Sequence, residues 1–393
     1  MLALDARNGR THGDLASAPL QRLRLLWYMP ASVYKLDCAS RSAARPFTPS
    51  GAPVEYVHVP KSGGTSIQHM LTSIARAQRL VTQRRDFGQY LGGRGRNASS
   101  SPPVLASGTV YDGHEPLGWG AMPSSSALTM VSWRESHISL ILSMYSYKAA
   151  QRLAPTGVYL REAEARLERA GVAPESMFDS LLRQDDPVAC GIAQTRSSSF
   201  LLPRSCSPTA LNVSEAALKE ASLSIKLKNL AAINIVVVTD RLGVQLPVQL
   251  RWHAPWVKVP AEVHDNGRTR PAQNLSEGVR SRLARHAGQH DGQRCWRGRA
   301  LEEEERLSGF AARVAEARTA HAAACLRRSR SGPCPVACQI NVSAAEEALL
   351  NRTIPTEWTA SCLQRGTAPR MRRSFVIGPH APGASLARPT RST

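Results

Sequence analysis

Three short runs of apolar, largely β-branched residues alternate along the chain with segments of helical periodicity. The runs are VEYVHV at 54–59, LTMVSW at 128–133 and NIVVVTD at 234–240. Apolar residues recur at helical spacing after the first run, and the second run leads directly into a long apolar helical segment. The third run follows a helical segment whose expected N-cap is Ser214. Alternating strands and helices predict an α/β fold, with a parallel sheet flanked by helices.

The periodic segments predict one main domain at residues 51–326. Residues 1–50 show weak periodicity and end in a proline-punctuated stretch, so they are expected to form an N-terminal tail that is disordered or serves in targeting. Residues 300–326 predict one more helix. Beyond it the composition shifts to proline, arginine and serine, which predicts a basic, cysteine-containing and largely disordered extension at 327–393.

The charge balance favours a polyanionic partner. The 393 residues include 50 Lys and Arg against 30 Asp and Glu, a formal charge of +20. Such a surface suits nucleic acid, sulfated or carboxylated glycans, acidic membranes or phosphate-rich cofactors, unless much of the arginine lies in disordered tails. Only 5% of the residues are aromatic. The stacking platforms of single-strand nucleic-acid binding are therefore scarce, and no nucleic-acid partner is expected.

Cysteines and glycosylation sequons both indicate an oxidising, secretory compartment. Of the eight cysteines, Cys334 and Cys338 have a metal-like spacing but no histidine partner nearby, so disulfides are preferred to zinc. Five sequons begin at Asn97, Asn212, Asn274, Asn341 and Asn351. No apolar run approaches the ~20 residues that a membrane span needs, although membrane association stays open. The arginine-rich start is alternatively a transit peptide.

The segment PKSGGTS at 60–66 has the layout of an anion-binding loop. It joins a strand to a helix, so several backbone N–H groups and the positive end of the helix dipole point at one spot. Glycines allow close backbone approach, hydroxyls add donors and the lysine adds a full charge. The candidate binding residues are Lys61, Ser62, Gly63, Gly64, Thr65 and Ser66. A nucleoside-triphosphate loop has its lysine after the glycines. Metal-assisted phosphoryl transfer, with Asp240 as the acidic metal holder, is therefore the alternative.

The same residues carry a family resemblance. VHVPKSGGTSIQ resembles the 5′-phosphosulfate-binding loop of membrane-type carbohydrate sulfotransferases. The resemblance implies a P-loop-NTPase-like sulfotransferase core, 3′-phosphoadenosine 5′-phosphosulfate as co-substrate, and no metal. It also implies that Lys61 contacts the bridging and sulfuryl oxygens while Ser62 to Ser66 surround the 5′-phosphate. A lysine and backbone donors placed there would stabilise the charge that develops on the leaving phosphate.

A second segment, VSWRESHISLILSMYSY, resembles the part of this family that binds the 3′-phosphate. By that resemblance Arg134 and Ser143 would bind the nucleotide. The segment lacks the family proline and internal arginine, and Ser143 lies nine residues after Arg134 where eight is usual. One extra residue rotates a helical side chain by about 100°. Ser139 or Ser136 is therefore an alternative.

Two further segments extend the resemblance. YDGHEPLGWG is similar to a family segment whose histidine lies near the acceptor, which makes His114 the candidate general base and Glu115 its rival. CGIAQTRSSSFLLPRSC resembles a segment that assigns Arg196 to the nucleotide or to an acidic acceptor. Cys190 and Cys206 bracket that segment and could close a disulfide loop.

Together these residues predict a sulfotransferase that moves a sulfuryl group to a hydroxyl of a carbohydrate, either a glycan or a proteoglycan. The expected partner is a carbohydrate acceptor, with acidic polysaccharides among the candidates, and the expected location is the Golgi lumen or the secretory pathway. Two alternatives stay open. One is a nucleotide-dependent P-loop kinase, and the other is a non-catalytic basic protein that binds glycans or nucleic acid.

Overall fold

The computed structural model describes ten segments of the chain. They contain the sheet, the helices that cover it and most of the candidate site residues. These segments are residues 32–38, 46–85, 107–114, 128–137, 139–140, 143–144, 197–202, 215–259, 298–328 and 336–354.

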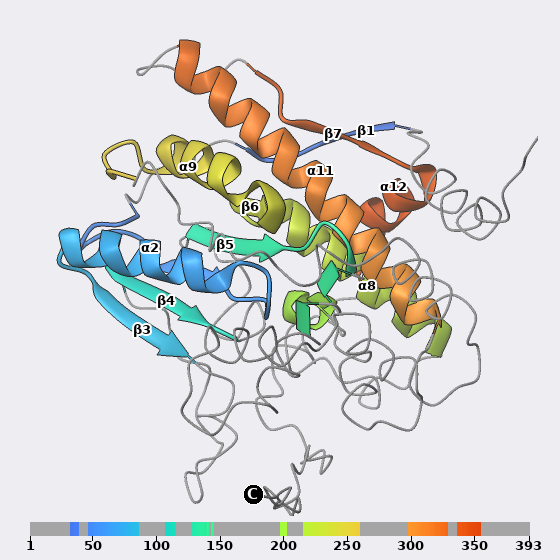
Figure 1. The fold of residues 1–393 in the computed structure, drawn as a ribbon. Coiled ribbons are helices and arrows are strands. Elements are labelled where there is room, and N and C mark those ends of the chain that lie inside the picture. Colours follow the sequence, from blue (N-terminus) through green and yellow to red (C-terminus); the bar gives the residue numbers. More distant parts are fainter. Residues whose placement is uncertain are drawn as a thin grey trace, which may run out of the picture.

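A five-stranded, all-parallel sheet forms the centre of the protein (Figure 1). Its strands are β2 (Val54–Val57), β3 (Val81–Arg85), β4 (Thr109–Gly113), β5 (Leu128–Trp133) and β6 (Ile235–Val238). The order across the sheet is β3-β4-β2-β5-β6, which places β2 in the middle. The expected α/β fold with a parallel sheet is thus confirmed. Two strands were not predicted, because β3 is polar at the sheet edge and β4 contains an aspartate and ends in glycine.

Helices cover both faces of the sheet. They are α2 (Gly64–Ala77), α8 (Glu215–Ala232), α9 (Leu242–His253) and α11 (Gly298–Arg328). Alternate residues of β6 point to opposite faces, so Ile235 and Val237 pack with α2 and α9 while Val236 and Val238 pack with α8 and α11. A strand buried on both faces must be apolar throughout, as β6 is.

The helix that begins within residues 60–66 shows the predicted spacing. Ile67, Met70, Leu71 and Ile74 are all buried in the core on the α2 face. These positions lie three or four residues apart, so they form one stripe that packs on the sheet. The stripe holds the first turn of α2 at the end of β2.

Elements of both predicted tails pack against the domain. Within residues 1–50, β1 (Ser32–Lys35) pairs antiparallel with β7 (Gln339–Val342), and α12 (Ala344–Asn351) follows β7 (Figure 1). The core on the α8 and α11 face includes Ile340 and Val342, so this two-stranded ribbon is buried on one side. The predicted limits of 51 and 326 therefore leave out packed structure. Tertiary contacts order these segments despite their polar, proline-rich surroundings.

A disulfide between Cys38 and Cys338 joins the two chain segments at one end of this ribbon, where β1 ends and β7 begins. Its existence confirms the preference for disulfides, and it uses Cys338 from the pair with metal-like spacing. Such bonds persist in oxidising compartments. Cys190 and Cys206 lie outside the described residues. None of the helices described here is both long enough and apolar enough to cross a bilayer.

Replacing both Cys38 and Cys338 by serine should lower the free energy of unfolding by about 2–4 kcal/mol. The reason is that the cross-link closes a loop of 300 residues and so restricts the unfolded chain. Urea denaturation without reductant, followed by circular dichroism, measures the change. As a control, Val33→Ala on β1, whose residue is 58% exposed, should alter stability by less than about 0.5 kcal/mol. Equal midpoints for wild type and the double variant would contradict the prediction.

Candidate functional site

The loop between β2 and α2 turns sharply at two residues with left-handed backbone. Lys61 has φ +61° and Gly63, the N-cap of α2, has φ +77°. A positive φ is routine for glycine but costs a lysine of order 1 kcal/mol, so the surroundings must impose it. Among the described residues no side chain caps the α2 N-terminus, and its first turn contains no acidic residue. Its positive dipole end is therefore available to an anion.

Ser62 lies inside this loop with a fully buried hydroxyl. The residue is 0% exposed, and its Oγ has no hydrogen-bond partner among the described residues. Burying an unpaired hydroxyl costs about 1–3 kcal/mol, which a bound oxyanion would recover by accepting the bond. Thr65 is exposed and Ser66 half-buried on the first turn of the helix. The loop thus carries an unsatisfied donor beside an uncapped helix end.

Arg134 links the second motif to this loop. It follows β5, which pairs in parallel with β2, so both strands end at the same edge of the sheet. The guanidinium is buried, and its Nε donates to the backbone carbonyl of Lys61 at 2.8 Å. Its Nη1 donates to Ser139 Oγ at 3.2 Å, and its Nη2 donates to Ser143 Oγ at 3.1 Å. One arginine therefore joins the two predicted anion-binding segments.

The extra residue between Arg134 and Ser143 does not separate them, because the long arginine side chain reaches both Ser139 and Ser143. The other alternative, Ser136, points elsewhere. Its hydroxyl donates to Glu305 of α11 at 2.9 Å. Ser139 and Ser143 thus accept hydrogen bonds from Arg134, whereas Ser136 donates its hydrogen bond to α11.

His114 lies at the end of β4, on the other side of β2. Its Nδ1 is 2.8 Å from the backbone carbonyl of His58. A carbonyl oxygen can only accept, so Nδ1 carries the proton and the neutral ring has its lone pair on Nε2. This is the tautomer that a general base requires. The candidate base therefore follows β4, the neighbour of β2 on one side, and Arg134 follows β5, its neighbour on the other side.

Two residues that were not singled out from the sequence complete this side of the site. The His58 ring lies 4.0 Å from the His114 ring, between centroids, and its Nδ1 is 3.5 Å from Oδ1 of Asp112. Both side chains are buried, and neither Asp112 oxygen has a hydrogen-bond partner among the described residues. The available signals were a histidine inside an apolar strand and an aspartate two residues before His114.

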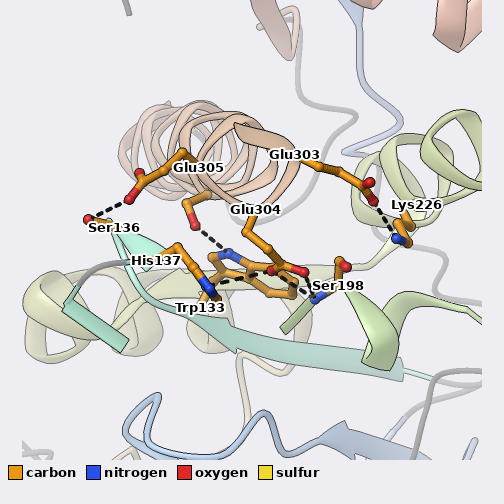
Figure 2. Close-up of polar contacts among 9 residues, drawn as sticks. Trp133, Ser136, His137, Ser198, Lys226, Glu303, Glu304 and Glu305 are labelled. Carbon is orange, nitrogen blue, oxygen red and sulfur yellow. Dashed lines mark hydrogen bonds and ion pairs between the residues drawn. The ribbon is translucent and has the colours of Figure 1, made fainter. Parts of the chain in front are cut away.

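Three consecutive glutamates of α11 bind residues of the segments that surround the C-terminal end of β5, where Arg134 lies (Figure 2). Glu305 accepts the bond from Ser136 described above. Glu303 accepts from Lys226 of α8 at 2.5 Å. Glu304 accepts from the backbone N–H of Ser198 at 3.1 Å and lies 3.8 Å from His137 Nδ1. The α11 helix thus fixes the β5 exit relative to the 3₁₀ helix η1 (Ser197–Leu201).

Burial raises the pKa of the Glu304 carboxyl from 4.5 to about 7. The bonds from Ser198 and the charge of Lys226 act in the opposite direction and do not offset the loss of hydration. Glu304 was not predicted from the sequence, since four glutamates on a helix resemble a solvated face. Only packing shows that this one is 1% exposed.

Some predicted residues have no place in this geometry. Arg196, Glu115, Cys190 and Cys206 lie outside the described residues, although η1 begins one position after Arg196. Asp240, the candidate metal holder, is exposed in the 3₁₀ helix η3 (Thr239–Arg241). Across the segments that the structure describes, no three His, Cys, Asp or Glu side chains are grouped so that they could hold a metal ion.

The stability of the protein should depend on Glu304 between about pH 4.5 and pH 7. There the unfolded state has released this proton while the folded state retains it, so the free energy of unfolding falls as the pH rises. The loss should be on the order of 3 kcal/mol. Glu304→Gln cannot ionise, so it should reduce the change of the free energy of unfolding with pH. Glu302→Gln, on the exposed face of α11, should leave that pH dependence unchanged. Urea titrations at pH 5 and 7.5 measure this difference in the free energy of unfolding. An equal difference for wild type and Glu304→Gln would refute the prediction.

Comparison with known proteins adds no assignment. No family model, no curated protein and no solved structure matches the chain.

Proposed function

We propose that the protein is a sulfotransferase that moves a sulfuryl group from 3′-phosphoadenosine 5′-phosphosulfate to a hydroxyl of a carbohydrate. The observation that carries this proposal is the bond from Arg134 Nε to the carbonyl of Lys61. It places a lysine-bearing loop and an arginine with two serines at one sheet edge. A donor with a 5′-phosphosulfate and a separate 3′-phosphate requires two such anion-binding groups.

In this proposal Lys61, Ser62 and the first turn of α2 hold the 5′-phosphosulfate, while Arg134 with Ser143 or Ser139 holds the 3′-phosphate. The acceptor oxygen attacks sulfur in line, and the bond from sulfur to the 5′-phosphate oxygen breaks. The acceptor proton passes to Nε2 of His114. The electron pair of the broken bond stays on adenosine 3′,5′-bisphosphate, whose developing charge is stabilised by Lys61 and the helix amides.

A carbohydrate acceptor fits the compartment that the surface features support. Asn341 and Asn351, two sequon asparagines among the described residues, are both exposed, and the Cys38–Cys338 disulfide favours an oxidising lumen. We place the enzyme in the Golgi lumen, where glycans and proteoglycans meet a nucleotide donor. The charge of +20 suits an acidic polysaccharide.

Phosphoryl transfer is the competing reaction, and one observation bears on it. Asp112 lies at the end of the strand beside β2, where a carboxylate could hold magnesium, but it faces His58 at 3.5 Å. Chelator separates the two reactions, because a kinase needs the metal for transfer and sulfuryl transfer does not.

Lys61→Ala should lower sulfuryl transfer by about 10²–10³-fold and weaken binding of adenosine 3′,5′-bisphosphate, because it removes the charge that meets the leaving phosphate. Transfer from labelled donor to desulfated heparin and chondroitin, together with calorimetry in EDTA, measures both effects. Lys35→Ala, an exposed lysine on β1, is the matched control and should match wild type. Bisphosphate binding that survives Lys61→Ala would overturn the proposal. Steeply salt-dependent glycan binding without transfer would indicate a non-catalytic protein.

His114→Asn should lower kcat by about 10²–10⁴-fold and leave bisphosphate binding within a few fold of wild type. The asparagine amide can still donate to the carbonyl of His58 but has no counterpart of Nε2 to accept the acceptor proton. His69→Asn, which changes an exposed histidine of α2, should behave as wild type. A variant that retains full kcat would remove His114 from the mechanism and leave Glu115 as the base.

A further inference from the structure

The imidazole of His58 touches both halves of the proposed reaction centre. A methyl group added at Gly64, in the first turn of α2, would lie 1.7 Å from His58 Nε2 and 2.0 Å from Cδ2. The ring edge therefore lies directly against the helix backbone. The centroid of the His58 ring lies 4.0 Å from the centroid of the His114 ring, and the two ring planes are tilted by 36°. One side chain thus spans the space between the donor loop and the candidate base.

The surroundings leave this ring little freedom. Tyr56, two residues earlier on β2, stacks on it at 5.5 Å between centroids, and Asp112 lies at its Nδ1. Tyr56 is itself held by a 2.7 Å hydrogen bond to Ser132. Burial raises the pKa of its phenol far above the ordinary value, so the ring remains neutral. His58 is 8% exposed. It cannot swing away from Gly64 without disturbing a packed row of three rings.

We propose that His58 is a positioning residue that sets the distance between His114 and the first turn of α2. This inference rests on the proposed function, in which the helix start holds the donor and His114 takes the acceptor proton. The glycine at position 64 is needed because the imidazole occupies the volume of a Cβ. Since both partners are in contact with the same rigid ring, the sulfur and the base are held in one fixed geometry. His58 itself contacts neither substrate.

His58→Ala should lower kcat by about 10²-fold, because a base displaced by about 1 Å loses that much rate. Bisphosphate binding should stay within about threefold of wild type, since the loop keeps its lysine and amides. A purely structural role would instead lower the thermal midpoint and reduce binding and turnover together. Calorimetry with adenosine 3′,5′-bisphosphate, thermal unfolding and transfer from labelled donor distinguish the two roles.

Gly64→Ala supplies the reciprocal test. The added methyl must displace either the helix start or the ring, so bisphosphate binding should fall about 10-fold or more and turnover further still. In His58→Ala/Gly64→Ala the clash is gone, so binding should return to within about threefold of wild type while kcat stays at the level of His58→Ala. Gly243→Ala is the matched control, because a methyl there meets no atom of the described residues within 4 Å beyond its chain neighbours and the nearby backbone of its own helix.

The outcomes separate this inference from the function on which it rests. If the wild-type protein neither binds the bisphosphate nor transfers sulfuryl groups, the proposed function and the inference both fail. If wild type is active and His58→Ala retains its kcat, the inference alone fails. It fails equally if the double variant binds the bisphosphate no better than Gly64→Ala. Recovery of binding without recovery of kcat supports it.

Discussion

The position of β2 between β4 and β5 is the constraint on which the candidate site depends. All three strands run in parallel, so the loop after β2, His114 after β4 and Arg134 after β5 emerge at one edge of the sheet. Segments about 50 to 75 residues apart in the chain therefore meet without a dedicated connection. A change of strand order would leave every motif intact and would still dismantle the site.

Side chains turn this shared edge into a defined geometry. Arg134 donates one hydrogen bond to the Lys61 carbonyl and two more to serine hydroxyls, so its guanidinium has a set orientation before any ligand binds. On the other side, the backbone carbonyl of His58 selects the His114 tautomer. In the proposed sulfuryl transfer this preorganisation would stabilise the leaving group, because groups already in place need no reorganisation as charge develops.

The outer layer of the protein supports this edge at a cost. The Glu304 carboxyl loses its hydration where α11 packs against the core, and this unfavourable desolvation raises its pKa. In return, the glutamates of α11 hold the β5 exit, η1 and α8 to one helix. The β1–β7 ribbon and its disulfide cover the same face of the core. The long α11 helix thus connects the site to β1 and β7, which lie in segments that composition predicted to be tails.

The local pattern of residue types predicted strands β2, β5 and β6, the apolar stripe of α2, and the turn between β2 and α2 for which we propose an anion-binding role. It could do so because doubly buried strands are apolar throughout and the helical period spans only a few neighbours. It did not indicate β3 and β4, because β3 is a polar strand at the sheet edge and β4 contains an aspartate and ends in glycine. Tertiary structure alone paired Cys38 with Cys338 across 300 residues. It also placed His58 against Gly64 and buried Glu304, because contact between distant segments depends on strand order and packing, which no local window of residues contains.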